Sequence, residues 1–148
     1  MNELFNTAFE ISLRVLLILN VARDTLSLEK ITAFDFIANY GTDFEVSDYN
    51  LHGNNRLRFS EYTVRREKVN QGIKDLVLIG YVLPCCSKEG FTYCLSENGR
   101  AFCRELNNEY ATKYSNMVNM VLSEYGNFSE TQLINKINHR AIAMFGGK

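Results

Sequence analysis

The residues best suited to chemistry in this chain lie between Ser47 and Glu67. This segment reads SDYNLHGNNRLRFSEYTVRRE and contains one histidine and four arginines. Guanidinium groups donate hydrogen bonds in a planar fork that fits phosphates and carboxylates. The segment therefore predicts binding either to nucleic acid or to acidic side chains. His52 could act as a base, but in a loop it is better interpreted as a hydrogen-bonded structural residue.

A helix expected from Ser60 to Ile79 determines where two of these arginines point. On a helical wheel turning roughly 100° per residue, the buried stripe is centred on Val69, and Arg65 and Arg66 lie at its two edges. The wheel therefore predicts that both guanidinium groups turn inward and clamp carboxylates. The candidate carboxylates are Glu61, Asp48 and Asp35.

The opposite face of this helix is expected to point outward and to bind a protein partner. Its residues are Val64, Glu67, Gln71, Lys74 and Leu78. A DNA-reading helix presents arginines, lysines and amides to base edges, whereas this face mixes charges of both signs with two aliphatic side chains. The residues that remain available for phosphate contacts are Arg56, Arg58, Lys68 and Lys88.

The elements that position this helix follow from hydrophobic periodicity and capping signals. We expect a first helix from about Leu4 to Arg23 and a second helix capped by Ser27 and ended by Gly41. After the third helix we expect a β-hairpin over Tyr81–Cys86 and Phe91–Leu95. A fourth helix should follow from Ser96 to about Leu122, and a last helix should begin at the capping box of Ser129 and Gln132. Residues 42–59 form a long connection without clear periodicity. The order of loop, helix and hairpin is typical of a winged helix-turn-helix.

The predicted fold is thus mainly α with a small β-hairpin. We interpret the chain as a single domain, residues 1–148, with a winged helix-turn-helix core over 1–95 and C-terminal helices over 96–148. Its 148 residues, 46% hydrophobic and 22% charged, suit one globular domain with a real core. The formal net charge of −1 argues against coating nucleic acid or membrane by bulk charge.

The N-terminus gives no signal for secretion or membrane insertion. Arg14 and Arg23 bracket the short apolar run Val15–Leu19, so a span of roughly 20 apolar residues cannot form there. We therefore expect a cytoplasmic protein.

No motif for catalysis is present, so we expect a non-catalytic protein without cofactors. The sequence has no glycine-rich phosphate loop, no HExxH and no nucleophile elbow, and nothing brings Cys103 and His139 together as a dyad. The four cysteines are Cys85, Cys86, Cys94 and Cys103. Their spacing matches no common zinc pattern, which favours reduced core thiols in and behind the hairpin. A disulfide, metal site or thiol sensor using Cys85, Cys86 and Cys94 is the alternative.

Three blocks of the sequence resemble the middle components of prokaryotic ABC-three-component systems. Phe5–Arg14 (FNTAFEISLR) is similar to that family's FNTPxEIGLR opening, with Ala8 in place of proline. Leu28–Gly41 resembles its helix with a short aromatic and glycine end. Ser47–Glu67 resembles its S-L-H-P loop and V-R-R-E-x-V helix start, with Gly53 where proline is usual. The resemblance covers about Leu4 to Leu122.

This resemblance implies a small accessory subunit beside an ABC or SMC-like ATPase, in a prokaryotic anti-phage or anti-plasmid defence complex comparable to Lamassu. The partners would be the ATPase and an effector of nuclease type, with DNA reached through the complex. The positions carried over from the family are His52, Arg56, Arg65, Arg66 and Glu67. The alternative is a winged-helix DNA-binding transcriptional regulator.

Overall fold

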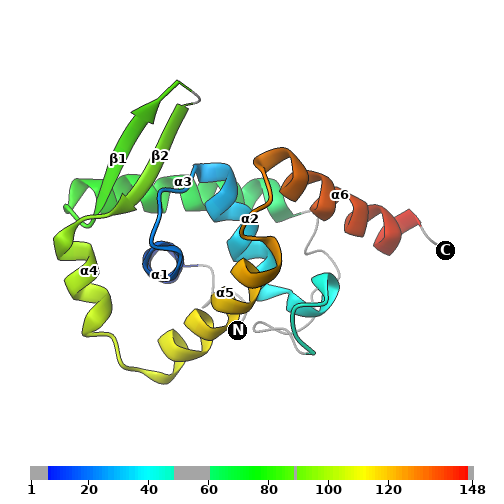
Figure 1. Ribbon diagram of the computed structural model, residues 1–148, viewed down its shortest axis with the longest axis horizontal. Coiled ribbons are helices and arrows are strands. Elements are labelled where there is room, and N and C mark those ends of the chain that lie inside the picture. Colours follow the sequence, from blue (N-terminus) through cyan, green and yellow to red (C-terminus); the bar gives the residue numbers. More distant parts are fainter. Residues whose placement is uncertain (1–6, 49–60, 89, 147–148) are drawn as a thin grey trace.

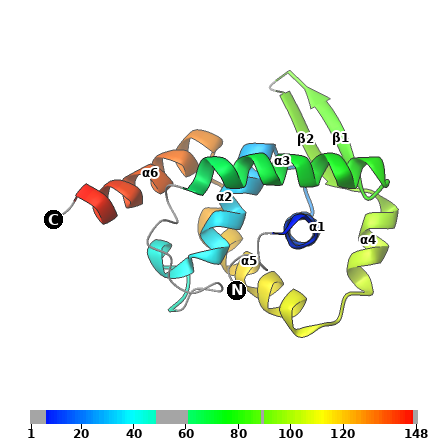
Figure 2. The same ribbon diagram turned by 180° about the vertical axis from the view of Figure 1, so that it is seen from behind.

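The first helix, α1, lies at the centre of the protein. The computed structural model describes residues 7–48, 61–88 and 90–146. α1 is seen end-on near the middle of Figures 1 and 2, and four other helices pack around it. The bounds of these helices are α1 Ala8–Ala22, α2 Leu28–Asn39, α3 Tyr62–Leu78, α4 Glu97–Arg104 and α5 Glu109–Tyr125.

The sequence of α1 explains its central position. Thr7 caps the helix, since its hydroxyl accepts a hydrogen bond from the Glu10 amide at 3.2 Å. Apolar residues then surround the helix on several sides, and the whole run from Leu13 to Leu19 is buried. A helix that is apolar all round must be covered on all sides. The broad burial expected for this helix is confirmed; its predicted start at Leu4 lies outside the described residues.

A two-stranded antiparallel hairpin projects from the helical body (Figure 1). β1 Val82–Ser87 pairs with β2 Gly90–Leu95, with Val82 opposite Leu95 and Ser87 opposite Gly90. An isolated bridge also joins β2 to the connection between α1 and α2: the amides of Leu26 and Tyr93 each donate to the other's carbonyl, at 2.9 and 2.8 Å. The expected mainly α fold with a small hairpin is confirmed.

The expected fourth helix from Ser96 to Leu122 is wrong, because the structure has two helices there. Ser96 does cap α4, and its hydroxyl accepts from the Gly99 amide at 3.0 Å. α4 ends at Arg104, and Asn108 caps a new helix, α5, by accepting from the Ala111 amide at 2.8 Å. The break lets both helices reach α1 from different directions, which one straight helix could not do. The N-cap signal of Asn108 was available in the sequence.

The last helix, α6 Glu130–Gly146, packs on α2 through Leu133 and Ile137 and then extends away from the body (Figures 1 and 2). The expected capping box is confirmed: the Ser129 amide donates to Oε1 of Gln132 at 2.8 Å, and the Gln132 amide donates to Oγ of Ser129 at 3.1 Å. Gly126 closes α5, as expected.

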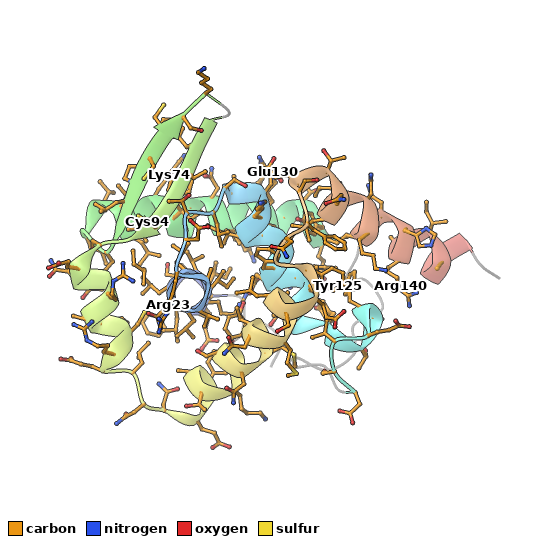
Figure 3. The ribbon with its side chains drawn as sticks, viewed as in Figure 1. Arg23, Lys74, Cys94, Tyr125, Glu130 and Arg140 are labelled. Carbon is orange, nitrogen blue, oxygen red and sulfur yellow. The ribbon has the colours of Figure 1, made fainter. Side chains whose placement is uncertain are left out.

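A short 3-10 helix, η2 Gly41–Phe44, follows α2. α2 therefore ends at Asn39, and Gly41 opens the next element instead of ending α2. Tyr125, labelled in Figure 3 near the end of α5, donates its hydroxyl proton to the carbonyl of Phe44 at 2.9 Å. The first residues of the expected loop over 42–59 are thus fixed to the core. Residues 49–59 of that loop and the expected cap Ser60 lie outside the described part of the chain.

Candidate functional site

The outward face of α3 carries the five residues that the wheel placed there. Val64, Glu67, Gln71, Lys74 and Leu78 are all exposed. The two aliphatic side chains are unusually open, since Val64 keeps 52% and Leu78 keeps 83% of its surface in contact with solvent. The side-chain amide of Gln71 donates to Asp75 at 3.0 Å. The face is therefore mixed in polarity and lies open along the helix, and its role in binding stays a prediction.

Arg65 turns into the core. Its side chain is 5% exposed, and its Nη1 lies 2.8 Å from Oδ2 of Asp35. The guanidinium carbon lies over the rings of Phe36 and Tyr40, 5.7 and 5.9 Å from the ring centroids. At such distances the aromatic faces attract the cation. Asp35 is thus the partner of Arg65, out of the three carboxylates that the sequence indicated.

Arg66 also points toward α2 but stays at the surface. Its Nε donates to Oε2 of Glu29 at 2.6 Å, and its side chain is 43% exposed. The hydrogen bond to Glu29 raises the pKa of Arg66. Glu29 was not among the candidate carboxylates, because the sequence does not show that the first turn of α2 lies beside the first turns of α3.

Arg14 completes the buried cluster, and sequence reasoning missed its role. This residue was interpreted as a charge bracketing an apolar run, yet its side chain is fully buried. Its guanidinium holds Asp35 by two bonds, from Nε to Oδ1 at 2.7 Å and from Nη2 to Oδ2 at 3.3 Å. The missed signal is helical spacing, since Arg14 lies three and four residues from the buried Ile11 and Ile18.

The carboxylate of Asp35 therefore collects donors from four helices. Besides the two arginines, it accepts from the Asn39 amide at 3.3 Å and from the Tyr114 hydroxyl. Burial by itself would raise the pKa of Asp35, but the charges of Arg14 and Arg65 outweigh burial and hold that pKa well below its ordinary value. Burial and the Asp35 charge raise the pKa of Tyr114 well above 10. The cluster is thus ionised, with two guanidinium groups on one carboxylate.

The predicted phosphate-contacting residues are only partly described. Lys68 on α3 and Lys88 at the hairpin turn are exposed. Arg56, Arg58 and His52 lie outside the described residues. Of the four predicted phosphate-contacting residues, the described part of the chain therefore contains only these two lysines.

The four cysteines carry free thiols, but only Cys103 is a core residue. Cys85 and Cys94 are partly exposed and Cys86 is exposed, so the expectation that all four are core thiols is wrong. Cys86 lies opposite Phe91, next to the turn of the hairpin, and the hairpin projects from the helical body (Figure 1). Cys94, labelled in Figure 3, lies at the base of the hairpin. Within the described ranges, no group of three or more His, Cys, Asp or Glu residues is placed to hold a metal ion.

Cys103 and His139 do not form a dyad. Cys103 lies on α4 and His139 on α6, at opposite ends of the molecule in Figures 1 and 2. The Cys103 thiol donates to the carbonyl of Leu16 at 3.7 Å, and burial raises its pKa to about 11. Such a thiol is protonated at neutral pH and is a poor nucleophile.

Comparison with known proteins gives one family. A sequence model described as "ABC-three component (ABC-3C) system Middle Component 2" matches residues 4–146. No curated protein and no solved structure matches the chain. None of the described helices is long and apolar enough to cross a membrane.

Proposed function

The chain belongs to the family of Middle Component 2 of ABC-three component systems, and we propose that it is a non-catalytic adaptor subunit that binds the ABC or SMC-like ATPase of its system. Membership makes it one component among several, so partner proteins follow from the family. The identity of the ATPase partner, a nuclease-type effector, and a role in a Lamassu-like anti-phage or anti-plasmid complex are parts of the proposal.

One observation carries this proposal: α3 turns Arg65 into the core, pairs Arg66 with Glu29 on α2, and leaves a mixed face outward. Arg65 and Arg66 are engaged by Asp35 and Glu29. The open face holds one acidic and one basic residue between the exposed Val64 and Leu78. Exposed aliphatic groups with interspersed charges favour protein contact over the phosphate backbone.

Co-expression with the neighbouring ATPase tests the proposal. We expect one stable complex on size-exclusion chromatography, and we expect Val64→Asp with Leu78→Asp to weaken it. Glu130→Lys on α6 is a control that changes the net charge by the same amount, in the opposite direction, on a different, exposed surface. Elution of the wild-type chain as a free species beside the ATPase would count decisively against an adaptor role.

The second candidate function is a winged-helix DNA-binding regulator, and one observation favours it. The bridge between Leu26 and Tyr93 adds a third short segment to the hairpin that follows α3. The order helix, bridge, helix, helix and hairpin is the arrangement in which a winged helix presents its third helix to DNA. Nanomolar, sequence-selective and salt-dependent binding of a DNA duplex by the isolated protein would favour this function over the adaptor.

A further inference from the structure

An apolar groove lies beside the C-terminal end of α3, on the side facing α1. Its volume is about 380 Å³. The lining residues come from the start of α1, the end of α3, Tyr81 and α4. Those that the argument uses are Phe9, Leu13, Asp75, Ile79, Tyr81 and Phe102. The rings of Tyr81 and Phe102 lie 5.2 Å apart and form one wall.

The rim of this groove exposes large apolar side chains that the fold leaves uncovered. Phe9 keeps 71% and Ile79 keeps 62% of its surface in solvent, and Leu78 next to Ile79 keeps 83%. Contiguous exposed apolar surface on a soluble protein marks an interaction site, because exposing it to water is unfavourable. Leu78 also belongs to the outward face of α3 and directly precedes the lining residue Ile79, so the groove and that face are adjacent along the chain.

The described lining of the groove carries a single carboxylate. Asp75 lines it, and one oxygen of this carboxylate accepts from the Gln71 amide. The other described side chains of the lining are apolar, aromatic or hydroxyl-bearing, so none of the described lining residues is a cation that could pair with Asp75. A ligand that fills the groove with apolar groups and places a cation at Asp75 satisfies both features.

The origin of the lining also limits the form of the ligand. The described lining residues belong to three helices and their ends, together with Tyr81, which precedes β1, so this part of the groove offers no strand edge for pairing. Recognition by side chains alone in an apolar groove is how an amphipathic helix docks, with apolar residues one turn apart.

We propose that this groove binds an amphipathic helix of another protein component of the system. Two large apolar side chains, one helical turn apart, enter the groove, and a lysine or arginine on the same helix pairs with Asp75. This inference rests on the proposed adaptor function and names the surface and the class of segment that it uses.

The test compares two aspartate substitutions in the full-length protein co-expressed with the other components. Ile79→Asp places a charge in the groove, and Ile142→Asp on α6 is the matched control, because Ile142 is 68% exposed against 62% for Ile79. We expect Ile79→Asp to weaken the complex about tenfold or more and Ile142→Asp to leave it unchanged. Asp75→Asn is expected to weaken it by roughly tenfold as well. Circular dichroism confirms that the variants are folded.

Four outcomes are distinguishable. Loss of the complex with Ile79→Asp alone supports the groove. Equal binding by both variants and wild type overturns the groove but leaves the adaptor function intact. Absence of any complex with wild type overturns both. A dimer of the isolated protein that Ile79→Asp dissolves, measured by light scattering, overturns the heterologous helix and assigns the groove to a second copy.

A photo-crosslinking residue at position 78 gives independent evidence. Leu78 directly precedes the lining residue Ile79 and is the most exposed of the large apolar residues described. Mass spectrometry of the adduct should map the crosslink to a helical segment of the partner that has apolar residues one turn apart and a basic residue beside them. An adduct confined to a loop or strand of the partner would overturn the proposal.

Discussion

Asp35 is the residue on which the interior of this protein depends most. Its carboxylate receives donors from α1, α2, α3 and α5, and it faces two buried guanidinium groups. Ionic groups in a core stabilise little compared with apolar groups of the same shape, but removing one partner leaves an uncompensated buried charge. The cluster therefore fixes how four helices meet more than it adds to total stability.

Replacing Asp35 by asparagine should destabilise the fold strongly. Asp35→Asn leaves the charges of Arg14 and Arg65 uncompensated, and we expect a loss of about 3–5 kcal/mol in the free energy of unfolding. Chemical denaturation at pH 7 measures it. The control is Glu29→Gln, which removes the partner of the exposed Arg66 and should cost less than about 1 kcal/mol. Equal losses in the free energy of unfolding for Asp35→Asn and Glu29→Gln would mean that burial of an ion pair does not determine the cost of removing its carboxylate.

A second substitution separates charge from shape at the same site. If uncompensated charge causes the loss, Arg65→Met added to Asp35→Asn should recover part of it, since one of the two buried cations is then gone. If the loss instead comes from disturbed packing, the double variant should be less stable than Asp35→Asn.

The contribution of Asp35 should also depend on pH. Its pKa is below the ordinary value in the folded state, so the native state holds the ionised form more strongly than the unfolded state does. The stabilisation is then complete above about pH 4, the pKa of an unfolded aspartate, and declines as pH falls further. The stability difference between wild type and Asp35→Asn should be constant from pH 7 to pH 5 and smaller at pH 3. A difference that grows toward pH 3 would contradict this sign.

The sequence could predict part of this residue-scale picture. A helical wheel was enough to turn Arg65 inward, because α3 has one clear apolar stripe. The same reasoning failed for Arg14, because α1 is apolar on several sides and a single charge there looks like an interruption. Tyr114 joins the cluster from 79 positions beyond Asp35, a contact that no local pattern encodes.

At the scale of elements, caps and turns were more predictable than lengths. Ser27, Ser96 and the capping box at Ser129 all begin helices where the side-chain chemistry indicated. The apolar face from Phe102 to Val121 has continuous helical spacing, yet the chain breaks inside it. Periodicity reports which face is apolar, and it does not report that α1 must be covered from two directions.

α4 is held to the start of the hairpin through Gly99. A β-carbon built at this glycine would lie 2.2 Å from the carbonyl oxygen of Tyr81, which accepts a hydrogen bond from the Ser96 amide at 3.0 Å. Backbone atoms cannot move aside as a flexible side chain can. We expect Gly99→Ala to destabilise the protein by about 1–3 kcal/mol, although alanine favours helices.

The neighbouring exposed position gives the control for Gly99→Ala. Asn98→Ala lies in the same turn of α4 and should change the free energy of unfolding by no more than about 0.5 kcal/mol. Thermal denaturation followed by circular dichroism measures both. A Gly99→Ala variant as stable as Asn98→Ala would show that α4 can shift away from the hairpin at little cost.

At the scale of the whole molecule, the hydrophobic core does not stop at residue 95. α5 contributes Tyr114, Met117, Val118 and Val121, each fully buried, to the same cluster as α1 and α2. α6 adds Leu133 and Ile137 and packs against α2. Part of the apolar surface of α1 is therefore covered by residues that follow the winged-helix core expected over 1–95.

Two truncations test how far this core is shared. A chain ending at residue 95 exposes the faces of α1 and α2 that α5 covers, and it also loses the Tyr114 hydroxyl from Asp35. Each large apolar side chain of α5 contributes about 1.5–3 kcal/mol by its burial, so losing four costs about 6–12 kcal/mol, which is comparable with a typical stability of about 5–15 kcal/mol. We expect no cooperative thermal transition from this fragment.

A chain ending at residue 128 keeps α5 and loses only α6, so it should still melt cooperatively, at a lower temperature than the full chain. A cooperative transition with native helix content in the 1–95 fragment would mean that the C-terminal helices are an appendage and not part of the core.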